Sequence, residues 1–376
     1  MTFREVCIAL NCAKDIGGAT VRKLCDFFKN LDGLDQADET QLMSVQGIGK
    51  VKAHQIYAAL RSDNWKRELE FAEKSKVNLL TPADELYPLR LKEIPDPPSA
   101  LYVAGNIMRM TSSCIAIVGT RAPTAYGAKV AFDFAENLAY SGYTIVSGLA
   151  EGIDTQAHRG ALCAVGAPTI AVLGSSIDCL YPKCNSPLAE AITSNGGAIV
   201  SEFPFKRPAN RLMFPQRNRI ISGLSLGVVA VEAPDGSGTL ITAECAADQG
   251  RTVMAVPGHI TSLQSRGTNR LLRDGAAVVC SPQDVIDELS LFKQPFKSQM
   301  PPRIIDAYIP PTPKPPNPNL SPDEQKVYDA IPVDGILLDD LLTRCGLPPQ
   351  NLNLILTRLS IRRLVSSDIT GTITKL

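Results

Sequence analysis

At 376 residues the chain is too long for one compact domain, so two or three domains are expected. Its 44% hydrophobic content is ordinary for a globular protein, and no apolar run is long enough to span a bilayer. The formal net charge is zero, which argues against a protein that is basic overall. The N-terminus turns polar too soon for a secretory signal, so we expect a cytoplasmic protein with no membrane partner.

The ten cysteines are scattered, and none forms a CxxC pair. The three histidines, His54, His158 and His259, are far apart in the sequence. A zinc site would need a closer grouping of such ligands, so we expect no metal and no cofactor. Scattered thiols in a chain of this size are typical of small core residues in a reducing compartment.

Residues 1–72 have a helical pattern, and residues 45–53, VQGIGKVKA, have the hxGxGxxxA spacing of a helix-hairpin-helix. Residues 15–24 resemble a degenerate second copy. The amides of such a glycine turn can hold a DNA phosphate, and nearby lysines add positive charge. Acids match bases across this region, so structural helix packing, as in sterile-alpha-motif-like domains, stays an equal alternative. The residues predicted for a secondary DNA contact are Gly47, Gly49, Lys50 and Lys52.

The second domain is predicted over residues 73–290, and its first part, to about 112, is punctuated by proline around a short strand-like run at 101–103. From about 113, short apolar runs alternate with helical patterns, for example Val130, Phe134 and Leu138 at four-residue spacing. Continuous apolar strands between amphipathic helices predict a doubly wound, Rossmann-like parallel sheet covered on both faces. The runs lie at 115–118, 143–146, 169–173, 198–200, 227–231 and 252–256.

Ligands of doubly wound sheets bind beyond the carboxyl ends of the strands, where this chain has mostly small and polar residues. The segment 117–127, IVGTRAPTAYG, combines a strand, a glycine turn and a helix start, so its amides can face an anion. It lacks both GxGxxG and the lysine of a P-loop, and is consistent with any phosphate ligand. The strand-end residues predicted to contact the ligand are Gly119, Thr120, Arg121, Ser147 and Gly148.

A second glycine loop lies at 233–244, APDGSGTLITAE, and Ser237, Gly238 and Thr239 are its predicted phosphate contacts. It resembles the PGGxGT loop of the phosphoribohydrolases known as lysine-decarboxylase-like proteins. Those enzymes place a glutamate three residues after the threonine, where this chain has Thr242, and the nearest acid is Glu244. A nucleotide or phosphoribosyl hydrolase therefore remains the alternative function, although the catalytic carboxylate is missing from its expected turn.

Residues 203–222 contain five basic residues and no acidic one, with Phe205, Phe214 and Asn218 interleaved. Such a stretch can form a positive wall for nucleic acid, or simply a solvated loop face. Arg217 and Arg219 begin a predicted helix, and they could instead pair with Glu202 or Glu232 in the strand-end crevice. Either phenylalanine could stack on a base.

A proline-dense linker is predicted over 291–320, followed by a winged-helix domain over 321–376. Two helical stretches around Gly346 and a strand-like end at 370–375 indicate the winged helix. Arg358, Arg362 and Arg363 could face DNA. The segment holds seven acids and six bases, so a protein-interaction or packing role stays open.

Eight motifs in unbroken order between about 115 and 280 resemble the DNA-processing protein A family, also called DprA or Smf. They are IVGTR, SGLAEGIDTQAH, VLGSSIDCLYP, SEFP, FPQRNRIISGLS, EAPDGSGTLITAE, AVPG and GTNRLLRDGA. The chain departs from the family pattern at Glu151, where arginine is expected, and at Ser175–Ser176, where Cys-Gly or Gly-Gly is usual. Both departures concern the edge of the expected site.

The resemblance implies a non-enzymatic protein that binds single-stranded DNA, protects incoming DNA during natural transformation and loads the RecA recombinase. It also implies a homodimer that associates through the region around 259–273. The DNA groove implied by the motifs is lined by Arg121, Lys183, Lys206, Arg211, Arg217 and Asn218.

Overall fold

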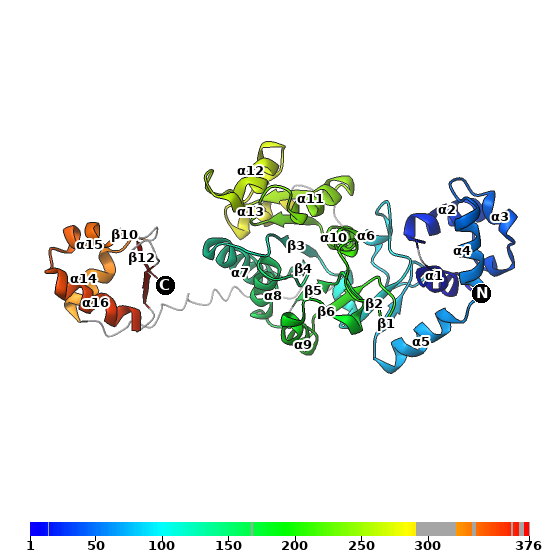
Figure 1. Cartoon of the computed structure of the whole chain (residues 1–376), viewed down its shortest axis with the longest axis horizontal. Coiled ribbons are helices and arrows are strands. Elements are labelled where there is room, and N and C mark those ends of the chain that lie inside the picture. The colour runs from blue at the N-terminus through cyan, green and yellow to red at the C-terminus, as the bar shows by residue number, and fades with distance from the viewer. Residues whose placement is uncertain are drawn as a thin grey trace. The chain divides into compact units, whose positions relative to one another are not determined.

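The structure is a computed structural model that divides into two compact units, Met1–Phe296 and Lys297–Leu376. The proline-dense segment lies outside the described residues. The two units are described separately below (Figure 1). The residues that the structure describes are 1–13, 15–166, 168–290, 321–332, 336–361, 364–367 and 372–375.

The first unit begins with a small helical domain. Thr2 and Asp38 each close a capping box at a helix start, which satisfies the free amides of the first turn. The apolar faces of these helices meet in one core that includes Leu10, Leu24 and Ile56. The helices are α1 (Phe3–Asn11), α2 (Gly18–Phe28), α3 (Glu39–Met43), α4 (Lys50–Arg61) and α5 (Asn64–Lys74).

A nine-stranded sheet follows, with the strand order β1-β2-β6-β5-β4-β3-β7-β8-β9. All neighbours from β6 to β9 are parallel, as the continuous apolar runs predicted. Two antiparallel strands of the proline-punctuated stretch extend the sheet beyond β6. The second of them contains the strand-like run predicted at 101–103, but the first strand and the antiparallel pairing on β6 were not predicted. The strands are β1 (Asn78–Leu80), β2 (Leu101–Gly105), β3 (Cys114–Val118), β4 (Thr144–Ser147), β5 (Thr169–Val172), β6 (Ala198–Ser201), β7 (Gly227–Ala230), β8 (Thr252–Ala255) and β9 (Ala277–Val278).

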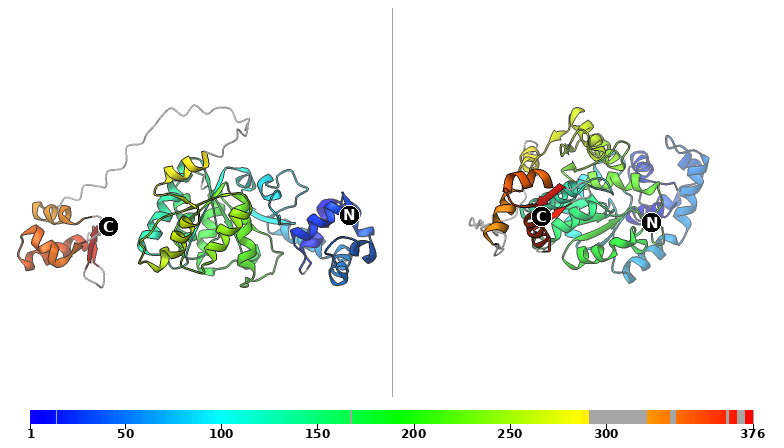
Figure 2. Two further views of the ribbon diagram at one scale, coloured as in Figure 1. Left: turned by 90° about the horizontal axis from the view of Figure 1, so that it is seen from above. Right: turned by 60° about the vertical axis from the view of Figure 1, so that its left-hand side comes forward.

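Helices cover both faces of this sheet, as Figure 2 shows from two directions. Alternate strand residues such as Ala116 and Val118 pack against one set of helices, and Ile115 and Ile117 pack against the other. The first set is α6 (Leu89–Lys92), α10 (Met213–Leu224) and α11 (Gly238–Asp248), and the second includes α7 (Ala125–Tyr140), α8 (Ile153–Leu162) and α13 (Pro282–Ser290). Two further helices, α9 (Ser186–Ser194) and α12 (Arg266–Arg273), complete the layers.

The second unit has the element order of a winged helix. Its three helices pack on a three-stranded sheet of order β10-β12-β11, around a core that includes Val327, Leu352 and Leu359. Gly346 adopts φ +62° and turns the chain between α15 and α16. The elements are α14 (Pro322–Ala330), β10 (Ile336–Leu337), α15 (Leu338–Cys345), α16 (Pro349–Ile361), β11 (Val365–Ser367) and β12 (Thr372–Lys375).

The predicted fold class is confirmed: a Rossmann-like sheet lies between an N-terminal helical domain and a C-terminal winged helix in the sequence. Among the described residues, we find no helix with the length and hydrophobicity of a membrane span.

His158 is buried where α8 packs on β5, and its hydrogen bonds define its tautomer. The hydroxyl of Thr169 donates to the carbonyl of Ile145 at 2.8 Å, so it accepts from Nδ1 of His158, also at 2.8 Å. The opposite nitrogen, Nε2, is buried and has no partner among the described residues. Burial therefore lowers the pKa of His158 to about 3, with a smaller contribution from Arg217.

This lowered pKa predicts a loss of stability in mild acid. The unfolded chain takes up a proton near pH 6.5 but the folded chain does not, so the free energy of unfolding falls as the pH drops below 6.5. Between pH 8 and pH 5 the loss from this residue is about 2 kcal/mol. Urea unfolding of the protein and of His158→Gln measures it. An equal pH dependence in both proteins would contradict the assignment.

Candidate nucleic-acid interface

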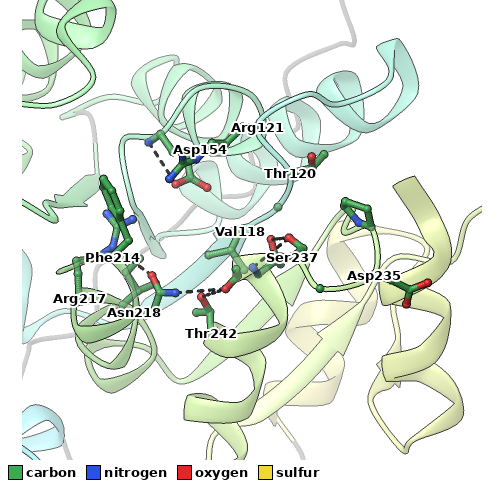
Figure 3. Close-up of a pocket in the computed structure, with 17 residues that line it drawn as sticks. Val118, Thr120, Arg121, Asp154, Phe214, Arg217, Asn218, Asp235, Ser237 and Thr242 are labelled. Carbon is green, nitrogen blue, oxygen red and sulfur yellow. Dashed lines mark hydrogen bonds between the residues drawn. The ribbon is translucent and has the colours of Figure 1, made fainter. Parts of the chain in front are cut away.

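The candidate site lies where the strand order reverses. β3 and β7 are neighbours in the sheet although three strands of the sheet, β4, β5 and β6, separate them in sequence. Such a switch point opens a crevice at the carboxyl ends of the strands. A pocket of about 380 Å³ occupies this place (Figure 3). It is lined by Val118, Gly119, Thr120, Arg121, Ala150, Asp154, Phe214, Arg217, Asn218, Ile221, Pro234, Asp235, Gly236, Ser237, Gly238, Thr239 and Thr242.

The first glycine turn is held on both sides by backbone hydrogen bonds. The amide of Thr120 donates to the carbonyl of Glu232 at 2.7 Å, and the carbonyl of Thr120 accepts from Ile153 at 3.1 Å. Gly152 adopts φ +82°, and a Cβ there would lie 2.4 Å from the carbonyl oxygen of Thr120. The close approach of these two loops therefore depends on glycine at 152.

The second glycine loop leads into α11 and leaves its first turn open. Ser237 is the N-cap, and its hydroxyl accepts from the amide of Thr239 at 3.2 Å. A Cβ built on Gly236 or Gly238 would meet no atom within 4 Å. Asn218 donates to the carbonyl of Gly238 at 3.3 Å and so ties α10 to this loop. The open helix start can approach an anion closely.

Arg217 forms the floor of the pocket and is buried. Its Nη1 donates to the carbonyl of Gly148 at 2.6 Å and to the carbonyl of Val172, and its Nε donates to Asn218 at 3.3 Å. These bonds join α10 to the ends of β4 and β5. A Cβ on Gly148 would lie about 2.5 Å from the guanidinium, so any larger residue there would displace Arg217.

Asp154 supplies the charge that balances this arginine. One of its carboxylate oxygens accepts from the amides of Gly148 and Ala150, at 3.1 and 3.3 Å. Burial raises the pKa of Asp154, against the pull of Arg217 and these amides. Burial also lowers the pKa of Arg217 to about 10, while Asp154 opposes that shift. The two charges stabilise each other electrostatically, although no ion pair within 4 Å joins them among the described residues.

The mouth of the pocket is aromatic and cationic. The guanidinium of Arg121 lies 5.1 Å from the ring centroid of Phe214, and the ring of Tyr181 lies 5.9 Å from the same ring. Phe205, the other predicted stacking residue, is buried against Phe71 and Tyr102 instead. Of the two phenylalanines, Phe214 therefore has the position to meet a base.

Of the charged side chains that line the pocket, one arginine has no carboxylate partner among the described residues. Arg217 is balanced by Asp154, and Asp235 pairs with Arg270 outside the pocket at 3.6 Å. Among the described residues, no carboxylate pairs with Arg121, which is exposed. An incoming anion would therefore meet a guanidinium with no ion pair among the described residues, beside the open glycine loop at 236–238.

Six of the predicted contact residues do not line the pocket. Ser147 is buried and donates to the carbonyl of Ile117 at 2.7 Å. Lys206 lies with its Nζ 4.4 Å from the ring centroid of Phe71 in α5. Lys183 and Arg211 are exposed elsewhere on the surface. The residues outside the lining are Ser147, Gly148, Lys183, Lys206, Arg211 and Arg219.

Arg219 forms an ion pair with an acidic side chain, which is the alternative to a DNA contact that the sequence left open. Its guanidinium pairs with Glu202 at 2.6 Å and with Asp96 at 2.9 Å, away from the pocket. Glu232, the other acid considered, accepts from the hydroxyl and the amide of Thr124 and so supports the start of α7.

The two glycine hairpins of the helical domain differ in their surroundings. At the first, the amide of Ala19 donates to Asp96 at 2.6 Å, so an internal carboxylate covers the start of α2. At the second, α4 begins after Gly49 with no side-chain cap, and a Cβ on Gly49 would meet nothing within 4 Å. The Nζ of Lys23 lies beside Gly47, 2.8 Å from where its Cβ would be.

In the winged helix, Arg358 is exposed on α16, and Arg362 and Arg363 lie outside the described residues. The described residues hold no group of three or more His, Cys, Asp or Glu side chains arranged to bind a metal.

Sequence reasoning missed Asp154, Tyr181 and Asp235. Asp154 and Tyr181 lie inside motifs already singled out, SGLAEGID and CLYP, but a motif does not say which members turn toward the pocket. A buried carboxylate at a helix start and an aromatic ring beside a strand-end turn were the available signals.

The fold and the site together define a doubly wound protein with paired glycine loops and an unpaired arginine at the switch point. Residues 78–290, more than half of the chain, match the family model described as "DNA recombination-mediator protein A". Residues 311–368 match the "DprA winged helix domain", and residues 11–63 match the "SAM-like Helix-hairpin-helix tandem". The chain therefore belongs to the DprA/Smf family.

Similar proteins include Protein Smf of Escherichia coli, 46% identical over 211 residues, which are 56% of each chain. Protein Smf of Synechocystis is 37% identical over 75% of this chain and 71% of its own. The match thus spans little more than half the length of the Escherichia coli relative.

Two solved structures are similar along most of their length. The X-ray structure of DNA processing protein A from Streptococcus pneumoniae has a TM-score of 0.65 and 32% identity, over 77% of this chain and 98% of that one. DNA processing protein A from Helicobacter pylori, described for its single-stranded DNA binding mode, has a TM-score of 0.52 and 30% identity, over 58% and 98%.

The packing of Gly148 against Arg217 gives a prediction about stability. Gly148→Ala would push a methyl group into the buried guanidinium, so we expect a loss of about 1–3 kcal/mol in the free energy of unfolding. Gly238→Ala is the matched control, because it also changes a glycine of the site but its methyl group meets open space. Thermal unfolding of both variants tests this, and equal melting temperatures would contradict it.

Proposed function

We propose that this chain binds single-stranded DNA at the switch-point pocket and acts as a recombination mediator without catalysing a reaction. The single observation that carries the proposal is Arg121, which has no ion pair among the described residues and lies beside Phe214 at the mouth of a pocket lined by the open glycine loop 236–238. The loops and the arginine suit a phosphate, and the ring suits an unpaired base. The similarity to the Helicobacter pylori protein, which is described as binding single-stranded DNA, supports the same ligand class.

The finer parts of the proposal follow from family membership. We propose that the protein protects incoming DNA during natural transformation, loads the RecA recombinase onto it and acts as a homodimer through the region around 259–273. Ile260 and Leu263 in that region are 85% and 62% exposed, which supports an association surface there.

A hydrolase at the same pocket is the alternative function. Thr242 lines the pocket where the related hydrolases carry glutamate, and its hydroxyl donates to the carbonyl of Gly238 at 3.4 Å. Glu244 is exposed and does not line the pocket. Asp154 is buried and accepts hydrogen bonds from two backbone amides. These contacts favour holding a ligand over cleaving it. Incubation with nucleoside monophosphates, followed by chromatography for released base, discriminates between the two functions.

Arg121→Ala should weaken binding of single-stranded DNA by roughly ten-fold, because a charge-assisted contact to phosphate is lost. It should also reduce the slope of log affinity against log salt concentration by about 0.7, the value for one phosphate of a single strand. Fluorescence anisotropy with labelled single-stranded and duplex oligonucleotides at several salt concentrations measures both.

Arg159→Ala is the control for this variant, since Arg159 is exposed on α8 and does not line the pocket. It should leave affinity and slope unchanged. A wild-type affinity that does not respond to salt, or stronger binding of a mononucleotide than of an oligomer, would refute the proposed function.

We propose the second glycine hairpin as a secondary DNA contact, with Gly47, Gly49, Lys50 and Lys52 as its members. Its support is the uncapped start of α4 with lysines beside it, in contrast to the internally covered start of α2.

Exchange of both Lys50 and Lys52 for alanine should weaken binding of long single strands by several-fold and leave short ones unaffected, because only a long strand can reach both places. Anisotropy with oligonucleotides of increasing length measures this. Exchange of Lys74, an exposed lysine at the end of α5, for alanine is the control. Equal losses for short and long strands would contradict a separate contact.

A further inference from the structure

We propose that Asp96 and Arg219 are positioning residues that couple docking of the N-terminal helical domain to the DNA pocket. Neither residue lines the pocket. The inference rests on the proposed single-stranded DNA binding, and adds that this binding depends on a domain that does not touch the pocket.

Helix α10 connects the pocket to the helical domain because successive residues of this helix point in different directions. Arg217 and Asn218 line the pocket, and Arg219 points away from it. Residues two apart on a helix lie about 200° apart around its axis. Arg219 is only 14% exposed and holds two carboxylates, Asp96 at 2.9 Å and Glu202 at 2.6 Å. Burial acts to lower the pKa of Arg219, but Glu202 and Asp96 together raise it above its ordinary value.

The second oxygen of Asp96 reaches the helical domain. Oδ2 accepts from Arg219, and Oδ1 accepts from the amide of Ala19 in the first turn of α2 at 2.6 Å. The N-cap of α2 is Gly17, which has no side chain to cap the helix. Asp96 therefore supplies the missing cap from another domain, where a carboxylate is also favoured by the helix dipole. One carboxylate thus joins α2 directly to α10.

The segment around Asp96 is packed tightly on both sides. A Cβ on Gly18 would lie 1.6 Å from the carbonyl oxygen of Pro97, so α2 rests directly on the backbone there. Arg22 donates to the carbonyls of Pro95 and Lys92 at 3.1 and 3.0 Å. On the other side, a Cβ on Gly223 of α10 would lie 2.7 Å from Leu91. The segment 91–97 therefore cannot shift without moving α2 or α10.

Such a connection makes two equilibria depend on each other. If docking of α2 favours the position of α10 in which Arg217 and Asn218 meet the ligand, then bound DNA must favour docking by the same factor. In this proposal the helical domain has two states, docked and undocked, and both Asp96 and the pocket bias the balance between them.

Asp96→Asn tests the coupling, because it keeps the shape of the side chain but removes its charge. We expect the affinity for single-stranded DNA to fall roughly five-fold. The salt slope should stay at the wild-type value, since no phosphate contact is lost, whereas Arg121→Ala changes the slope. Asp26→Asn is the control, because it makes the same change at an exposed acid two turns further along the same helix α2.

A second readout follows the opposite direction of the coupling. Hydrogen exchange of the full chain should slow at residues 15–24 when single-stranded DNA is added, and this protection should be lost in Asp96→Asn. If that variant does not fold, Arg219→Lys replaces it, because lysine retains the charge but cannot hold two carboxylates in the same geometry.

Wild-type affinity of Asp96→Asn, a reduced salt slope in it, or exchange at 15–24 that does not respond to DNA would each overturn the coupling. Failure of the proposed function is distinguishable, because in that case the wild-type protein itself would not bind single-stranded DNA in a salt-dependent way.

Discussion

The buried guanidinium of Arg217 is the contact on which the candidate site depends. It joins α10 to the carbonyl groups at the ends of β4 and β5, beside the carboxylate of Asp154. A buried charge of this kind is tolerated only when it is paired and hydrogen-bonded. The space and hydrogen bonds that this guanidinium requires therefore constrain the residues around it. They account for the glycine at 148 and for the amides that hold Asp154.

Two arginines therefore have different roles, one in the structure of the pocket and one in meeting the ligand. Arg217 maintains the shape of the pocket and is already balanced by Asp154. Arg121 lies at the mouth, has no ion pair among the described residues, and rests on an aromatic ring. The cation that is free to meet a phosphate is thus the exposed one. The glycine loops beside it add amides rather than further charge, which fits a protein with a formal net charge of zero.

The parallel strands were predictable because their residues are buried on both faces and read as continuous apolar runs. The run at 101–103 indicated β2, but β1 and the antiparallel pairing were not predictable, since β1 has only three residues and lies in proline-rich surroundings. In the site, the glycine loops could be located from their position after strands. The roles of Arg217 and Arg219 could not, because α10 begins at Met213, four residues before the predicted start. The sequence also does not determine which face of this helix lies against the sheet, and the position of Tyr181 depends on a contact between distant loops.

The antiparallel pair also has a consequence for how the chain can be divided. β2 pairs with β6 and thereby occupies the backbone donors and acceptors on the outer side of that strand. A fragment that began at β3 would keep the whole pocket but would leave β6 as a bare edge, ready to pair with another molecule. The family motifs begin only at about residue 115. A fragment chosen from the motifs alone would therefore be too short to keep the edge of β6 covered. The strand that shields β6 lies before them, next to the helical domain.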